Sequence, residues 1–406
     1  MNSLGGNMAS VKLQNRALIL NVLKKVGTIS RLDIANTLSL TPAAITIIVN
    51  EMLKEDIVKE VGQLEEDGRR SGRKKVLIDI NYDYKYVIGI NIESDIINIG
   101  VSNLKGEIRA RKKITTDKTL KPEDLLKAVA SECMKILWTE NIMKESILGA
   151  GVGIVGPVDR NKGVSIRAYG LWKGKVDVKK ILEEEMNIKV VIDNNVRTLA
   201  LGEMEYHLND SIPSMLFIKY GPGIGSAIII DNEIYEGSRD EAGEIGHTVV
   251  DIDGELCRCG KRGCLETVAS KNAIVNKVSD IFSEMDTPAL FMLTNGDENN
   301  INLDNINQAI KEGDDKVKEI LDKAVFYLAL AIGNTINIVD PYSIALYGEI
   351  FRNEYVLGLL IDHLKNLTCI ENPEEVVYIS ALNKKSNYIG AIALALREFF
   401  YNIGGM

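Results

Sequence analysis

The amino-acid sequence predicts a winged helix-turn-helix domain at the N-terminus, followed by a larger α/β region that forms two lobes. Three observations support this organisation. Residues 12–80 show the pattern of three helices followed by two strands around a basic loop. The rest of the chain alternates strands with helices and twice begins a group with paired strands, as a duplicated fold would. A loop at 244–266 gathers three of the five cysteines and one of the three histidines, which suggests a metal site.

Composition and charge narrow the class of protein. The 406 residues carry a formal net charge of −9, yet residues 1–80 hold 12 Lys and Arg against 9 Asp and Glu. A basic first segment on an acidic body is expected when one domain binds phosphate and the other does not. The N-terminus lacks a signal-peptide pattern and no long uncharged apolar run occurs, so we expect a cytoplasmic protein without membrane contact. Five cysteines, an odd number, argue against a disulfide framework.

The first 54 residues contain the helix pattern of a helix-turn-helix. An apolar stripe predicts a helix over 12–26, and Ser30 is the expected N-cap of a short second helix. Thr41 and Pro42 mark the start of a third helix, because a capping hydroxyl is followed by proline at the first helical position. We expect this helix to enter the major groove of DNA with its first turns. Its candidate DNA-binding residues are Thr41, Pro42, Ala43, Ala44 and Thr46.

A basic hairpin follows the helices. The expected strands at 57–61 and 76–80 flank an acidic stretch and then five positive charges within residues 69–75. Such a loop can follow the phosphate backbone, and an arginine beside a glycine can enter the minor groove. The candidate DNA-binding residues of this wing are Arg70, Arg73 and Lys74. The alternative is a three-helix domain with a solvated, charged hairpin.

Residues 82–406 form the larger region, in which we expect two lobes. The first spans about 82–195 and receives the C-terminal helix, and the second spans about 196–385. Two lobes that begin with the same strand pairing leave a cleft between them, which is a common place for a ligand. The expected strand pairs are 86–92 with 96–102 in the first lobe and 215–220 with 226–230 in the second.

The loop at 244–266 carries a set of metal ligands. Cys257, Cys259 and Cys264 lie close together in the sequence, His247 precedes them, and the glycines between them permit tight turns. Thiolates and imidazole are the usual ligands of tetrahedral Zn²⁺, and four protein ligands leave no position for a catalytic water. The pattern therefore predicts a structural zinc site. A cysteine-rich loop without metal is the alternative, but it does not account for the histidine.

Carboxylates flank these ligands. Glu244 precedes His247 by three residues and Glu266 follows Cys264 by two, so closure of the loop around a metal would draw both towards the histidine. Acidic acceptors beside a rigid loop suit sugar hydroxyls, although both could equally be solvated charges. The motifs Glu-x-Gly-His and Cys-x-Cys-Gly-x-x-Gly-Cys-x-Glu resemble the signature of the ROK family, which contains sugar-responsive repressors and sugar kinases on an actin-like fold.

The resemblance extends over nearly the whole chain and includes the Gly72-Arg73 pair of the wing. It implies a winged helix over residues 1–80 and an actin-like sensor over 82–406. It further implies that Asp193 aligns with the carboxylate that removes a proton from the sugar hydroxyl in the kinases. Asp193 could also be the N-cap of the helix that begins near Asn195. The implied sugar-binding residues are Asp193, Glu244, His247 and Glu266.

The kinases of the family are the main alternative. Their first phosphate loop reads Asp-x-Gly-Gly-Thr, whereas this chain has Asn91, Glu93 and Asp95 at the corresponding run. The aspartate that organises magnesium is missing, and two carboxylates bring like charge to the expected site of the phosphates. The loop 221–225 has proline where the kinases have threonine, and 346–349 lacks their Gly-Gly pair. We therefore expect no enzymatic activity.

The predicted function is repression of sugar uptake or catabolism genes, with operator affinity controlled by a sugar in the cleft. The resemblance points to xylose, glucose or N-acetylglucosamine repressors. The expected partners are double-stranded operator DNA, a small sugar and further copies of the chain, since helix-turn-helix proteins usually bind paired half-sites as dimers. Two alternatives remain, namely a ROK sugar kinase with residual activity and a repressor controlled by a protein partner without sugar binding.

Overall fold

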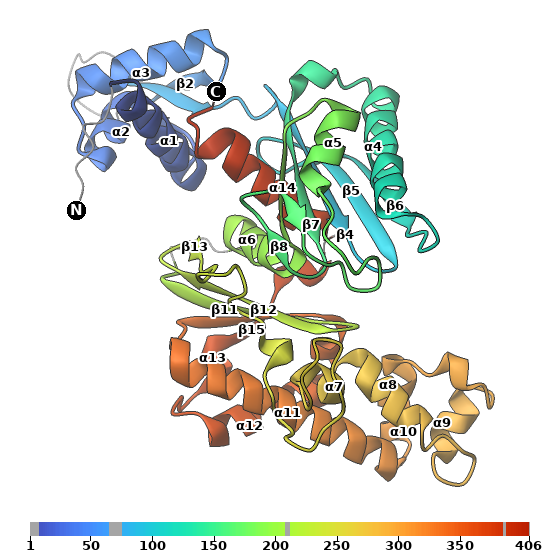
Figure 1. The fold of residues 1–406 in the computed structure, drawn as a ribbon. Coiled ribbons are helices and arrows are strands. Elements are labelled where there is room, and N and C mark those ends of the chain that lie inside the picture. The colour runs from blue at the N-terminus through green and yellow to red at the C-terminus, as the bar shows by residue number, and fades with distance from the viewer. Residues whose placement is uncertain (1–7, 65–74, 208–211, 385–386, 406) are drawn as a thin grey trace. The chain divides into compact units, whose positions relative to one another are not determined.

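The computed structural model describes residues 8–64, 75–207, 212–384 and 387–405. The chain divides into two compact units, one formed by Met1–Asn209 with Ser386–Met406 and the other by Asp210–Lys385 (Figure 1). The first unit therefore extends past residue 195, the expected end of the first lobe. Within the described residues, no helix combines the length and the apolar composition that a bilayer span requires.

The N-terminal region contains three helices and a small antiparallel sheet of order β1-β3-β2, whose first strand lies between the first and second helices. Ser30 caps the second helix by accepting a hydrogen bond from the Asp33 amide, and Thr41 caps the third by accepting one from Ala44. These local signals place both helix starts where the sequence predicts them. The elements are α1 (Met8–Val26), β1 (Ile29–Ser30), α2 (Arg31–Leu38), α3 (Pro42–Lys54), β2 (Val58–Leu64) and β3 (Lys75–Ile80).

The remainder of the first unit is built on a five-stranded sheet of order β10-β7-β4-β5-β6. The two predicted strands are confirmed as β4 (Tyr86–Ile92) and β5 (Ile96–Asn103). Side chains alternate along β4, so Ile88 and Ile90 pack towards α4 and α5 while Gly89 faces α14. The other elements are β6 (Ile108–Thr115), α4 (Pro122–Thr139), η1 (Lys144–Ser146), β7 (Ile147–Ile154), β8 (Val158–Asp159), β9 (Val164–Ser165), α5 (Val178–Met186), β10 (Val190–Asn194), α6 (Asn195–His207), α14 (Tyr388–Leu396) and the π-helical turn η6 (Arg397–Tyr401).

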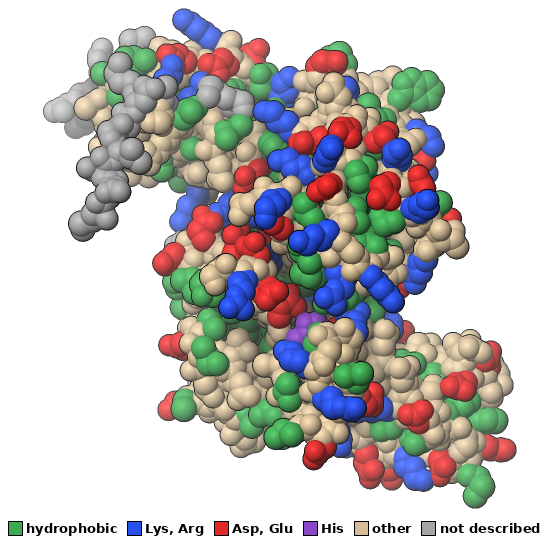
Figure 2. All heavy atoms as spheres, in the orientation of Figure 1, with side chains coloured by type: hydrophobic (Ala, Val, Ile, Leu, Met, Phe, Trp, Pro, Cys, Tyr) green, Lys and Arg blue, Asp and Glu red, His purple; other side chains and the backbone are tan. Residues whose placement is uncertain are grey.

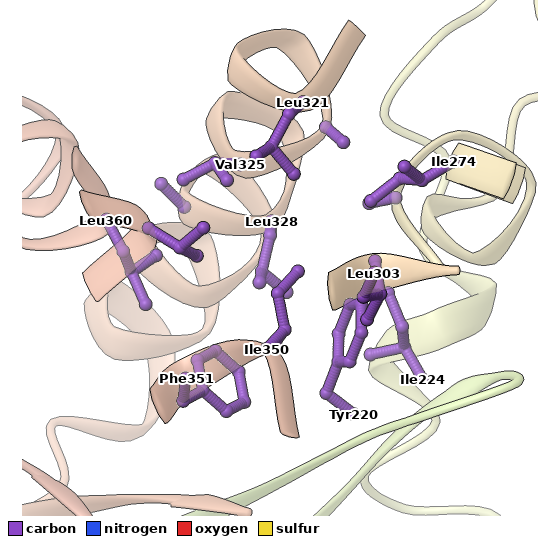
Figure 3. Close-up of a cluster of buried hydrophobic side chains, with 14 of the residues drawn as sticks. Tyr220, Ile224, Ile274, Leu303, Leu321, Val325, Leu328, Ile350, Phe351 and Leu360 are labelled. Carbon is purple, nitrogen blue, oxygen red and sulfur yellow. The ribbon is translucent and has the colours of Figure 1, made fainter. Parts of the chain in front are cut away.

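The second unit contains another five-stranded sheet, of order β13-β12-β11-β14-β15. Its helices enclose an apolar core in which Leu328 of α11 lies near Ile350 and Tyr220 (Figure 3). The strand elements are β11 (Ser214–Tyr220), β12 (Ile224–Ile230), β13 (Glu233–Ile234), β14 (Ser343–Tyr347) and β15 (Val377–Ile379). The helical elements are η2 (Ile245–His247), α7 (Leu265–Ala269), α8 (Lys271–Ser279), α9 (Pro288–Leu293), η3 (Glu298–Asn300), α10 (Leu303–Lys311), α11 (Asp315–Val339), η4 (Glu349–Arg352), α12 (Glu354–Leu367), α13 (Pro373–Val376) and η5 (Ala381–Lys384).

Candidate functional site

The predicted metal ligands meet in the second unit. One ligand atom from each of His247, Cys257, Cys259 and Cys264 lies within 4.8 Å of the others. The histidine ends the short helix η2, and Cys264 is the N-cap residue of α7. A bridge between Val249 and Cys264 holds these two ends of the loop together. The predicted clustering of these four side chains is therefore confirmed, in an arrangement that a metal ion could occupy.

The ligand spacing fits a tetrahedral ion. Around tetrahedral Zn²⁺, with bonds of about 2.3 Å to sulfur and about 2.0 Å to nitrogen, neighbouring ligand atoms lie roughly 3.5–3.8 Å apart. The distance from Cys257 Sγ to His247 Nδ1 is 3.5 Å, and that from Cys259 Sγ to Cys264 Sγ is 3.6 Å. Burial raises the pKa of the Cys264 thiol to about 12. A bound cation would reverse this preference, because it stabilises the thiolate.

The two flanking glutamates lie beside this cluster. The backbone oxygen of Glu244 accepts a hydrogen bond from the His247 amide at 3.0 Å, so the two residues share one tight turn. Glu266 lies in the first turn of α7, next to the ligand Cys264. Glu244 thus lies three residues from the ligand His247, and Glu266 lies two residues from the ligand Cys264.

Arg258 is a site residue that the sequence analysis did not identify. Its Nη2 and Nε each lie 2.8 Å from an oxygen of Glu266, which makes a bidentate ion pair. The Glu266 carboxylate also lies against the turn between β11 and β12, because a Cβ at Gly223 would come within 2.3 Å of it. A carboxylate therefore occupies space beside the glycine loop that binds phosphate in the kinases. In the sequence, only the position of Arg258 between the ligands Cys257 and Cys259 indicated that its side chain belongs to the site.

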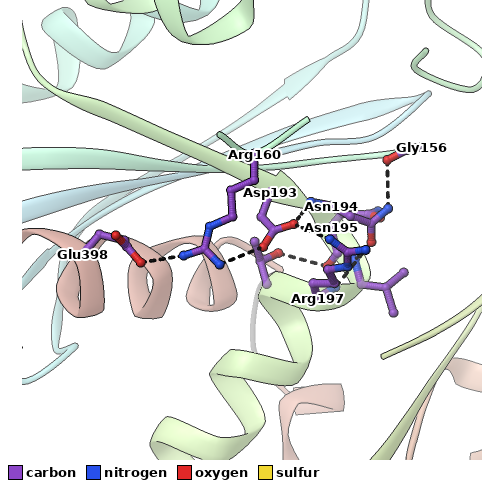
Figure 4. A network of polar contacts seen from close by, with 9 residues as sticks. Gly156, Arg160, Asp193, Asn194, Asn195, Arg197 and Glu398 are labelled. Carbon is purple, nitrogen blue, oxygen red and sulfur yellow. Dashed lines mark hydrogen bonds and ion pairs between the residues drawn. The ribbon is translucent and has the colours of Figure 1, made fainter. Parts of the chain in front are cut away.

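Asp193 lies in the first unit within a buried charged network (Figure 4). Its Oδ1 accepts a hydrogen bond from the Asn194 amide at 2.7 Å and lies 3.6 Å from Nη1 of Arg197. Its Oδ2 lies 3.9 Å from Nη1 of Arg160, whose Nη2 is 2.5 Å from Oε1 of Glu398. Two arginines thus balance two carboxylates, which lowers the penalty of burying them.

The capping role at the start of α6 belongs to Asn194 and not to Asp193. The side-chain oxygen of Asn194 accepts a hydrogen bond from the Val196 amide at 2.7 Å, as an N-cap does. The alternative reading of Asp193 as the helix cap is therefore wrong. Its carboxylate lies between Arg160 and Arg197, which stabilise its charge.

The run that replaces the first phosphate loop is held by amide side chains. Oε1 of Glu93 accepts hydrogen bonds from Asn91 at 3.2 Å and Asn387 at 3.1 Å. Asp95 pairs with Lys118 at 2.6 Å, and the hydrogen bond from this lysine lowers the pKa of Asp95. Lys118 therefore compensates the charge of Asp95, and the like charge expected at this place rests mainly on Glu93.

The start of α3 presents the predicted DNA-binding side chains. Thr41, Pro42, Ala43 and Thr46 are exposed, whereas Ala44 is half-buried. The same helix face continues to Ile47, which is 61% exposed, and to Asn50. Ile47 and Asn50 each lie four residues after a predicted contact, Ala43 and Thr46, so the helical repeat alone could have identified them.

The predicted wing contacts Arg70, Arg73 and Lys74 lie outside the described residues. On the face of the molecule shown in Figure 2, acidic and basic side chains are interspersed.

The sugar candidates are divided between the units. Glu244, His247 and Glu266 belong to the second unit, where they flank or belong to the metal loop, and Asp193 belongs to the first.

Two of the comparisons with known proteins cover nearly the whole chain. The xylose repressor of Caldicellulosiruptor bescii is 28% identical over 403 residues, which are 97% of this chain and 98% of the repressor. A solved ROK family transcriptional regulator, a homologue of the E. coli MLC protein, has a TM-score of 0.82 at 21% identity and covers 97% of this chain and 98% of its own. A ROK glucokinase from Streptomyces griseus, solved with glucose and AMPPNP, has a TM-score of 0.65 at 24% identity and covers 76% of this chain and 98% of its own. The ROK family itself matches residues 87–398, and the chain therefore belongs to the ROK family.

Proposed function

We propose that the chain is a transcriptional repressor of sugar uptake or catabolism genes whose operator affinity is controlled by a bound sugar. The observation that carries the proposal is the share of this chain that aligns with each kind of relative. The xylose repressor aligns with 97% of this chain, whereas the glucokinase aligns with 76%. The ROK family match begins only at residue 87, so the segment before it is an addition to the family domain. The xylose repressor also aligns with nearly all of this chain, including most of that segment. We further propose that the protein acts in the cytoplasm.

Residues 1–80 are the proposed winged helix-turn-helix domain. The three helices, the capped start of α3 and the antiparallel sheet β1-β3-β2 support this assignment. The exposed first turns of α3 would read base edges in the major groove, and Arg70, Arg73 and Lys74 would contact phosphates or the minor groove. Paired half-sites would require a homodimer or a higher oligomer.

Residues 82–406 are the proposed actin-like sensor. Glu244, His247, Glu266 and Asp193 supply the acceptors and the ring nitrogen that sugar hydroxyls require. Nδ1 of His247 faces Cys257, so the metal would engage one side of the ring and leave Nε2 as the atom for a hydroxyl. Zn²⁺ is the proposed ion, because its softness and preferred geometry fit three sulfurs and one imidazole. Its role would be to hold the loop rigid.

A kinase reaction is not proposed. The carboxylate of Glu93 is fixed by Asn91 and Asn387 at the run that in the kinases binds magnesium and phosphate. The Glu266 carboxylate lies against Gly223 of the second glycine loop. Glu93 thus presents negative charge to a polyphosphate, which opposes its binding. The charge of Glu266 is compensated by Arg258, and its carboxylate opposes a phosphate by occupying the space beside Gly223.

The test of the function is calorimetric titration of the full-length, zinc-loaded protein with D-xylose, D-glucose and N-acetylglucosamine. In parallel, DNA retardation is measured with a duplex that the protein selects from a randomised pool. Saturable binding of one sugar that changes the DNA affinity supports the proposal. DNA binding without any response to the three sugars would favour regulation by a protein partner. ATP-dependent phosphorylation of a sugar would reinstate the kinase alternative.

Ala43→Glu should weaken DNA binding roughly tenfold while leaving the fold intact, because the new carboxylate would face phosphates and base edges. Ala43 is exposed in the first turn of α3, where an acidic residue stabilises a helix by about 0.3–1 kcal/mol through the helix dipole. The measurement is DNA retardation together with thermal unfolding. The matched control is Asn272→Glu, an equal charge change at an exposed position in the first turn of α8. Equal DNA affinity in both variants would exclude α3 from the interface.

A further inference from the structure

The candidate sugar carboxylate is connected to the last helical turn of the chain. Asp193 and Glu398 both contact Arg160, at 3.9 Å and 2.5 Å (Figure 4). Glu398 is separated from Arg160 by 238 residues in sequence and belongs to the π-helical turn Arg397–Tyr401. One guanidinium is therefore shared between the proposed ligand site and η6. Turns of π geometry are uncommon and occur frequently at functional sites.

The same turn leads directly to the N-terminal helices. The hydroxyl of Tyr401 donates to the Leu104 carbonyl at 3.1 Å, and Nζ of Lys24 in α1 lies 4.4 Å from the centre of the Tyr401 ring. Three residues further on, the Gly404 carbonyl accepts a hydrogen bond from Nε of Arg16 at 2.9 Å. Gly404 has φ +68°, and a Cβ there would lie 2.6 Å from Cβ of Arg16. Only glycine permits this close approach.

Arg16 continues the connection to α3. Its side chain is 2% exposed, and its Nη1 donates to Oε1 of Glu55 at 3.1 Å. Glu55 is the C-cap residue of α3, the helix proposed to enter the major groove. A buried guanidinium is strongly destabilised when it loses a hydrogen-bond partner. We therefore expect Arg16 to keep its partners and to move together with them. A shift of Gly404 must therefore move Arg16 and the end of α3 or break these hydrogen bonds.

We propose that Arg160, Glu398 and the segment 397–405 transmit sugar occupancy at Asp193 to the DNA-contacting helix α3. This inference rests on the proposed function. A sugar hydroxyl that donates to Asp193 shares the charge of its carboxylate and weakens its attraction for Arg160, which then pairs with Glu398 alone. Rewinding of the π turn to α geometry would rotate Gly404 against Arg16. In this proposal the turn, π-helical in the structure and α-helical after rewinding, is the two-state element that such coupling requires.

The test uses the full-length protein, the three sugars named above and the selected duplex. The coupling factor is the ratio of DNA affinities without and with saturating sugar, and the ratio of sugar affinities without and with DNA must give the same value. Glu398→Gln keeps the shape of the side chain and removes its charge at the sugar end. Gly404→Ala introduces a Cβ at the DNA end. The matched control is Glu140→Gln, an exposed glutamate that caps α4 in the same unit.

We expect both variants to reduce the coupling factor from a wild-type value of roughly 5–150 to below about 2, and the control to keep it. Glu398→Gln should retain the sugar-free DNA affinity, and Gly404→Ala should retain the DNA-free sugar affinity. If both variants couple as strongly as the wild type, the transmission route is wrong while the proposed function stands. A wild-type protein whose DNA affinity responds to none of the sugars overturns the proposed function and this inference with it. If Glu398→Gln loses sugar binding, the coupling factor of Gly404→Ala still tests the route, because Gly404 lies at the opposite end of the segment.

Discussion

Replacing Cys259 by Ser should remove the bound metal and lower the thermal unfolding temperature of the second unit by at least about 10 °C. Cys259 supplies one of four ligand atoms that lie within 4.8 Å of one another. A serine hydroxyl is a poor ligand for zinc, and the energy of binding a structural metal is largely folding energy. The loop also holds His247 and Glu266, so their arrangement should be lost with the metal. Metal content by mass spectrometry and calorimetric unfolding measure both effects.

The matched control for this substitution is Cys369→Ser. Cys369 is an exposed free cysteine in the same unit and lies outside the metal cluster. It should keep both the metal content and the unfolding temperature of the wild type. Treatment of the wild type with a chelator should reproduce the Cys259→Ser result, and added Zn²⁺ should restore it. A wild-type protein that is metal-free and unfolds at the same temperature as Cys259→Ser would show that the cluster is not a metal site.

Local chemistry was sufficient to predict much of this structure. The caps Ser30 and Thr41, the strands at 86–92 and 96–102, and the metal loop depend on residues that are neighbours in sequence. A capping hydroxyl, a proline at the first helical position or alternating burial acts over only a few residues. The ligand cluster could be predicted for the same reason, since its spacing is set by tight turns within one loop.

Contacts between distant segments could not be predicted in this way. Arg160 and Glu398 meet because α14 packs on the sheet that carries β7 and β10, and nothing near either residue indicates the pairing. The pair formed by Arg258 and Glu266 depends on the side-chain direction that the folded metal loop imposes. The capping role of Asn194 differed from the expectation because two adjacent residues could both cap, and their side-chain directions decide which one does.

Two runs of this chain correspond, by resemblance, to the phosphate loops of the ROK kinases, and each of them carries a glutamate or lies against one. Glu93 is held by asparagine amides, and Glu266 is held by Arg258 against Gly223. In both places the carboxylate is a satisfied hydrogen-bond acceptor, so its presence does not destabilise the protein. Glu93 opposes a polyphosphate by its charge, and Glu266 does so by the space that it occupies beside Gly223.

Glu244→Gln should reduce sugar affinity about 10- to 100-fold and abolish the sugar response, because a hydrogen bond to a charged acceptor contributes about 1.5–3 kcal/mol. Glutamine has nearly the same shape but one fewer acceptor oxygen and no charge. Glu244 shares the turn of His247 and is exposed, so the change should not disturb the core. DNA affinity without sugar should remain that of the wild type, since Glu244 belongs to the second unit and α3 to the first. Calorimetric titration and DNA retardation measure the two affinities.

The control for Glu244→Gln is Glu241→Gln, which makes the same chemical change three residues earlier in the same exposed segment. It should bind sugar and release DNA as the wild type does. Metal content must be equal in both variants, because loss of the metal would disturb His247 and produce the same loss of binding for a different reason. If Glu244→Gln retains its metal and still responds normally to sugar, the ligand lies away from the metal loop. If both glutamine variants lose the response equally, the loss follows the charge of the loop and not a contact made by Glu244.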